Sequence, residues 1–125
     1  MPEFPSVVEK ISYRVRSDNS PITIKAKVGS AQRGVPVAIL DEDTDVPENA
    51  LPDGTVQFNP GAGSALIGHV VRVQTFVSDV NPNTNLTIVN YEISGGLQTV
   101  MDNTQGDVEE EGGRIGHFFF ISFES

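Results

Sequence analysis

Several residue types are absent or scarce in this chain of 125 residues, and each absence removes a class of function. The absence of cysteine excludes disulfides, thiolate nucleophiles and cysteine-ligated zinc sites. Tryptophan is also absent and there are only two tyrosines, so stacking surfaces for sugar rings are few. No apolar run is long enough to span a membrane, and no signal peptide precedes the first apolar segment. We therefore expect either an intracellular protein or the mature form of a secreted one.

Cations are scarce as well, because eight Lys and Arg residues stand against seventeen Asp and Glu residues. The resulting net charge of −9 opposes binding to the phosphate backbone of a nucleic acid. Residues 1–40 carry six cations against three carboxylates, whereas the other 85 residues carry two cations against fourteen carboxylates. The chain therefore combines a basic end with an acidic body, and we expect it to be electrostatically two-faced.

The chain does contain short extended segments bounded by turn residues. Residues 8–16 and 22–28 alternate apolar and polar side chains, which indicates strands with one buried face. Three further runs, at 70–77, 86–93 and 97–101, are separated by Asn, Pro and Gly and favour a meander that ends in a Gly-Gly turn. These patterns predict an all-β fold in which antiparallel strands follow one another closely.

The last segment, residues 115–123, is apolar on both faces and is expected in the middle of a sheet. Counting all segments, we expect about seven or eight strands and no substantial helix. The expected architecture is a single antiparallel β-sandwich domain over residues 1–125, immunoglobulin-like or jelly-roll-like in topology. A small barrel is the alternative.

The first two expected strands would form a hairpin with a cationic outer face. Its five cations are Lys10, Arg14, Arg16, Lys25 and Lys27. One interpretation is a docking surface for an anionic partner, such as an acidic protein, a glycan or another copy of the chain. The other interpretation is that these cations provide solubility and discourage pairing at an exposed strand edge.

Three aspartates alternate along one acidic stretch and are weak candidates for a calcium site: Asp41, Asp43 and Asp45. An EF-hand is excluded because its glycine and glutamate positions are occupied by Val46 and Pro52. A calcium site between sandwich loops and a solvated acidic loop are the two remaining interpretations. Residues 41–66 form a long irregular connection, which favours a binding loop and suits a calcium-assisted carbohydrate-binding module.

The only two histidines, His69 and His117, each follow an Ile-Gly pair at the expected start of a strand. Together they could form a metal site or a pH-sensitive pair, but the expected meander places them a strand length apart. Residues 61–65 fit neither a nucleophile elbow nor a phosphate loop. We therefore expect no enzyme, since an active site would have to be assembled from distant residues.

These observations predict a non-catalytic binding or assembly module that acts through protein–protein contacts. Its basic face, within residues 10–27, and its acidic loops, at 41–53 and 102–114, would be the two contact surfaces. Complementary but different patches on one subunit make a heterologous contact, which closes into a ring or extends as a filament. The calcium-assisted carbohydrate-binding module is the alternative function, and calcium is the only cofactor that the sequence suggests.

Overall fold

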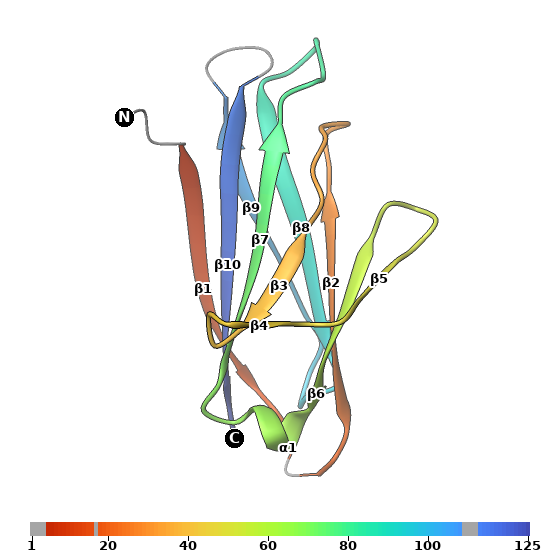
Figure 1. Cartoon of the computed structure of the whole chain (residues 1–125), viewed down its shortest axis with the longest axis vertical. Coiled ribbons are helices and arrows are strands. Elements are labelled where there is room, and N and C mark those ends of the chain that lie inside the picture. Colours follow the sequence, from red (N-terminus) through yellow and green to blue (C-terminus); the bar gives the residue numbers. More distant parts are fainter. Residues whose placement is uncertain (1–4, 17, 109–112) are drawn as a thin grey trace.

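A computed structural model describes residues 5–16, 18–108 and 113–125, and it confirms the expected all-β sandwich. Ten strands form two five-stranded sheets, and the one described helix, α1 (Gly63–Leu66), is a single turn at one end of the sandwich (Figure 1). Among the described residues, no helix has the length and apolar character needed to cross a membrane.

The two sheets have the following strands, given in their order across each sheet. Sheet A consists of β1 (Ser6–Arg14), β10 (Arg114–Glu124), β7 (Val70–Ser78), β3 (Val37–Leu40) and β4 (Thr44–Asp45). Sheet B consists of β5 (Glu48–Ala50), β6 (Val56–Ala62), β2 (Pro21–Val28), β8 (Leu86–Ser94) and β9 (Val100–Asp107). All neighbours are antiparallel except β1 and β10, which are parallel.

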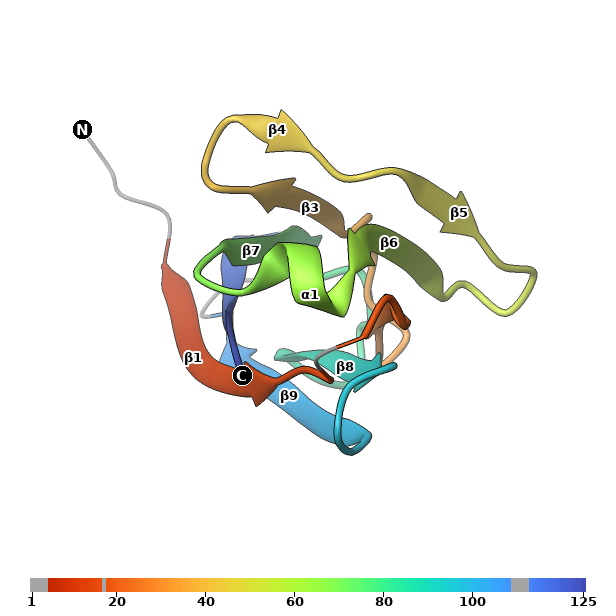
Figure 2. The same ribbon diagram turned by 90° about the horizontal axis from the view of Figure 1, so that it is seen from below.

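The strand order is that of an immunoglobulin-like Greek key rather than a jelly roll. β10, β7, β3 and β4 are neighbours in the way that strands G, F, C and C′ are in an immunoglobulin variable domain, and β5, β6 and β2 correspond to D, E and B. The β8–β9 hairpin is an addition that lies next to β2. Figure 2 shows the two sheets from below, with α1 crossing from β6 to β7.

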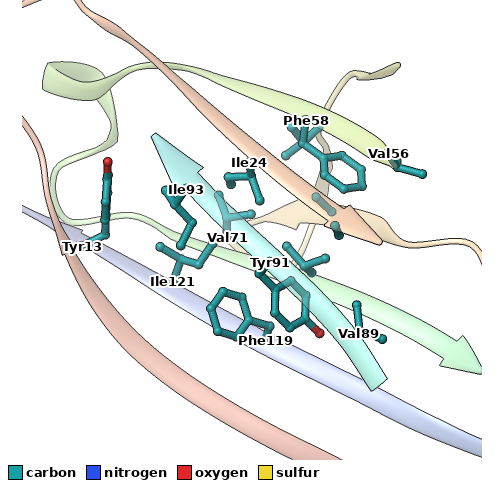
Figure 3. Close-up of a cluster of buried hydrophobic side chains, with 14 of the residues drawn as sticks. Tyr13, Ile24, Val56, Phe58, Val71, Val89, Tyr91, Ile93, Phe119 and Ile121 are labelled. Carbon is teal, nitrogen blue, oxygen red and sulfur yellow. The ribbon is translucent and has the colours of Figure 1, made fainter. Parts of the chain in front are cut away.

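The hydrophobic core lies between the sheets and is built from the apolar positions of the alternating strands (Figure 3). Phe119 on β10 stacks on Tyr91 of β8, with ring centroids 4.0 Å apart and an angle of 6° between the planes. Tyr13 is buried as its alternation predicts, and its hydroxyl donates to the Gln98 carbonyl at 2.6 Å. The Gly96 N–H in turn donates to the Tyr13 hydroxyl at 2.9 Å, so this tyrosine ties β1 to the β8–β9 connection.

Two of the expected strand pairings are wrong. β1 and β2 do not form a hairpin, because β1 pairs with β10 in sheet A while β2 lies between β6 and β8 in sheet B. β7 and β8 do not belong to one meander either, since they lie in different sheets. β8 and β9 do form a hairpin, but its connection is residues 95–99 rather than a Gly-Gly turn, so residues 97–99 are not part of a strand as expected. β9 extends to Asp107 and occupies much of the stretch expected to be the acidic loop 102–114. Residues 109–112 of that loop lie outside the described residues.

Candidate functional site

The five cations expected to share one surface are divided between the two sheets. On the outer surface of sheet B, Lys25 pairs with Glu92 at 3.7 Å and Lys27 pairs with Asp53 at 3.9 Å. These side chains are roughly half exposed, so solvent screens the two ion pairs and each contributes little stability. Their charges are nevertheless balanced within the chain, which leaves them less available to a partner.

The other three predicted cations lie on or just after β1. Lys10 Nζ lies 5.7 Å from the centroid of the Phe120 ring, and Arg16 Nε donates to the Gly96 carbonyl at 3.1 Å. Arg14 is exposed. Within the part of the chain that the structure describes, none of these three cations is in an ion pair. We call Lys10 and Arg14 the cationic side of sheet A.

The opposite edge of sheet A is acidic. Residues 41–48 contain five carboxylates and no cation, and every one of these five side chains is exposed. Three of them are on β4, on the turn before it, or on β5, the next strand along the chain and the outermost strand of sheet B, and we call them the acidic side: Asp43, Asp45 and Glu48. Since β1 and β4 are the two outermost strands of sheet A, the two sides lie four strand spacings apart, roughly 19 Å (Figure 2).

Asp41 is separated from the other two calcium candidates by its own hydrogen bonds. Its Oδ2 lies 2.5 Å from His69 Nδ1, and its Oδ1 accepts the Val70 N–H at 3.0 Å. The Val70 N–H, followed by His69, holds the pKa of the Asp41 carboxyl below its usual value of 3.8. Over the described ranges, no group of three or more His, Cys, Asp or Glu side chains is arranged to hold a metal ion.

The two histidines do not meet. His69 is exposed and lies just before β7. His117 is on β10 and fully buried, and it pairs with Thr75, which follows His69 by six residues along β7. This separation, roughly 20 Å, agrees with the expected distance of a strand length. Although His117 was expected near the start of a strand, its ring points into the core. His69 has a carboxylate partner, but no described hydroxyl is hydrogen-bonded to it as a nucleophile would be.

A pocket of about 290 Å³ opens on the outer surface of sheet A, between the β3–β4 turn and the middle strands. It is lined by Asp41, Glu42, Val70, Arg72 and Phe120. Arg72 is half-buried, and its Nε is inaccessible to water and without a hydrogen-bond acceptor in the described part of the chain. Asp41 and Glu42 have positive φ angles of 51° and 71°, a costly backbone conformation for residues other than glycine.

Sequence reasoning missed Arg72 and Phe120 as site residues. Arg72 stands between Val71 and Val73, so alternation does place its side chain on the outer surface. Phe120 alternates with Phe119 and Ile121 in the same way. Only the register brings them together, since Phe120 pairs directly with Arg72 across β10 and β7.

Comparisons of this chain with protein-family models, with curated proteins and with solved structures find no match.

Proposed function

We propose that the chain is a non-catalytic β-sandwich module that assembles through protein–protein contacts between copies. The cationic side of sheet A, Lys10 and Arg14, meets the acidic side, Asp43, Asp45 and Glu48, of a neighbouring copy. The observation that carries this proposal is the charge difference between β1, at one edge of sheet A, and residues 43–48, which run from the opposite edge at β4 into β5 of sheet B. Because the two patches differ and lie on opposite edges, the contact is heterologous and generates a ring or a filament.

The two contact surfaces contain other residues than the sequence led us to expect, but the contact is still one between a basic and an acidic patch. Lys25 and Lys27 leave the proposed contact because they lie on sheet B and have carboxylate partners there. On β1, by contrast, Lys10 and Arg14 have no ion-pair partner among the described residues. A neighbouring copy would supply the missing carboxylates without rearrangement of the sheet.

Charge reversal tests the contact directly. The variant K10E/R14E puts like charges opposite the acidic side, and the variant D43K/D45K puts like charges opposite the cationic side. Each variant alone is expected to stay monomeric in sedimentation velocity experiments in which the wild type associates with rising concentration. An equimolar mixture of the two is expected to associate again, because every contact between unlike variants joins opposite charges.

The control variant K25E/K27E changes the net charge by the same amount as K10E/R14E but acts on sheet B, so it is expected to associate like the wild type. Added salt is expected to weaken the association, since the screening length falls from about 10 Å at 0.1 M to about 3 Å at 1 M ionic strength. A wild-type protein that remains monomeric at every concentration and salt level contradicts the proposal.

A further inference from the structure

The pocket on the outer surface of sheet A brings together one unsatisfied donor group, two carboxylates and an aromatic wall. Arg72 and Val70 come from β7, Phe120 comes from β10, and Asp41 and Glu42 come from the β3–β4 turn. With about 290 Å³, it is close to the lower limit of small-molecule pockets and suits one or two sugar-sized rings. No residue of the proposed assembly contact lines the pocket, although Lys10 Nζ lies 5.7 Å from the centroid of the Phe120 ring.

The guanidinium of Arg72 needs an acceptor that the described part of the chain does not provide. Its neighbours in the register are Phe120 on one side and Ile39 on the other, and neither side chain can accept a hydrogen bond. The Nε atom is buried and unpaired. Since water does not reach Nε, a ligand in the pocket accepts instead from the Nη groups of the same guanidinium, which have no hydrogen-bond partner among the described residues.

The carboxylates provide the opposite half of the hydrogen-bonding pattern. Asp41 is held in place by His69 and by the Val70 N–H, and its lowered pKa keeps it ionised at neutral pH. Each of its oxygens has a further lone pair, and an ionised carboxylate can only accept hydrogen bonds. Glu42 is exposed at the tip of the turn, so its carboxylate can also reach a ligand in the pocket.

We propose that this pocket binds a neutral polyhydroxylated ligand, a saccharide, without calcium. A sugar hydroxyl can donate to a carboxylate and accept from Arg72 at the same time, which neither an anion nor a cation can do. The two carboxylates repel an anionic ligand, and Arg72 repels a cationic one. Phe120 and Val70 provide an apolar wall for the C–H face of the sugar ring.

Calcium is not part of this proposal, because the pocket provides too few oxygen ligands. Calcium takes six to eight oxygen ligands, whereas only Asp41 and Glu42 provide carboxylates here, and no three such groups among the described residues are arranged to hold a metal ion. Asp43 and Asp45 do not line the pocket. The carbohydrate-binding function expected from the sequence is therefore assigned to a different site, the pocket on sheet A, and it no longer includes calcium.

The test is an NMR titration of the ¹⁵N-labelled full chain in the presence of EDTA. The probes are glucose, galactose, mannose and N-acetylglucosamine, each at up to about 100 mM, and sodium acetate and ammonium chloride are the charged controls. At least one sugar is expected to shift the Arg72 Nε–Hε signal and the amides of Glu42 and Phe120 saturably, with a roughly millimolar dissociation constant.

Two matched substitutions locate the binding. Arg72→Lys keeps the positive charge but removes the planar Nη donors, and it is expected to weaken sugar binding roughly ten-fold. Arg114→Lys is the same substitution at an exposed position of β10 in the same sheet, outside the pocket and outside the proposed assembly contact, and it is expected to leave binding unchanged. Glu42→Gln, at an exposed turn position, is expected to weaken binding as well without disturbing the fold.

The proposal is overturned if none of the four sugars shifts these signals, if acetate alone shifts them saturably, or if binding appears only with added calcium. It is also overturned if Arg114→Lys weakens binding as much as Arg72→Lys. If the protein is monomeric and binds sugar, only the assembly proposal is contradicted. If the protein assembles and does not bind sugar, only the saccharide proposal is contradicted.

Discussion

His117 Nε2 lies 2.8 Å from Thr87 Oγ1, and this contact joins sheet A to sheet B inside the core. Thr87 donates its one hydroxyl proton to the Gly106 carbonyl at 2.8 Å, so it accepts from His117 and the proton of the ring is on Nε2. His117 Nδ1 then accepts from Thr104 at 2.7 Å, and Thr104 accepts from the Tyr91 hydroxyl at 3.0 Å. A one-way chain of hydrogen bonds therefore fixes the neutral Nε2–H tautomer.

Replacing Thr87 with Val is expected to lower the free energy of unfolding by about 1–3 kcal/mol, because it leaves the buried Nε2–H of His117 without an acceptor. Urea denaturation measures the change, and ¹⁵N chemical shifts of the His117 ring in the wild type report the tautomer. Thr23→Val is the matched control, since Thr23 has only a 3.5 Å contact with Asn59 at the outer surface of sheet B. Equal losses in the two variants contradict the role assigned to Thr87.

Stability is expected to fall as the pH is lowered from about 6.5 to about 4. Burial lowers the pKa of His117 from 6.5 to about 4, so in this range the unfolded chain binds a proton that the folded chain does not. The stabilisation is fully present above pH 6.5 and is lost as the pH falls through the window, by up to about 3 kcal/mol. Urea denaturation at several pH values measures the slope.

Three carboxyl groups act at lower pH and can be separated from this effect. The three aspartates Asp18, Asp41 and Asp53 accept hydrogen bonds from Ser20, Val70 and Thr55, respectively, and these bonds hold their pKa values below 3.8. Their contributions to stability are therefore lost only below this pH window. An NMR titration follows His117 itself. A His117 ring that titrates near pH 6.5 in the folded protein, or a stability that is flat between pH 7 and 5, contradicts the prediction.

Side-chain alternation identified the strands of this fold but not their partners. β1 and β2 both alternate apolar and polar residues, and this pattern is the same whether two strands pair side by side or face each other across a core. Here the two strands lie in different sheets, and their apolar sides meet in the same core. The predicted cationic hairpin failed for this reason, although each cation does lie on the outer side of its strand.

The central position of β10, the Phe-rich strand, was predictable because its side chains are apolar on both faces. β10 lies between β1 and β7, as a strand with two apolar faces should. The pocket beside it was not predictable, since it requires Phe120, Arg72 and the β3–β4 turn to meet through a register that no local pattern encodes. His117 was misplaced for a related reason, because its buried partners come from β8 and β9 in the other sheet.

The two faces of β10 are expected to differ sharply in their effect on stability. Phe119→Ala is expected to lower the free energy of unfolding by about 3–5 kcal/mol, because Phe119 is fully buried and stacks on Tyr91. Phe118→Ala, one residue earlier, removes a half-buried outer ring that packs edge-to-face against Phe76, and it is expected to cost about 1 kcal/mol. Similar losses in thermal or urea unfolding contradict the placement of these two rings.

Gly95 is expected to be the glycine least tolerant of a side chain in the β8–β9 connection. Its φ is +99°, and a Cβ there would lie 2.1 Å from the Pro21 carbonyl oxygen. Gly54 has a similar φ of +91° but nothing within 4 Å of its Cβ position. Gly54→Ala is thus expected to cost only the backbone strain, about 1 kcal/mol, whereas Gly95→Ala adds a steric clash and costs roughly 2–4 kcal/mol.

Thermal unfolding of the two alanine variants separates these contributions, because the backbone term is nearly the same in both. The carbonyl of Pro21 belongs to the first residue of β2, which is paired with β6, so it cannot easily move away from a new methyl group. The lower melting temperature is therefore expected for Gly95→Ala. If both variants melt together, the β8–β9 connection does not pack against β2 as closely as these positions require.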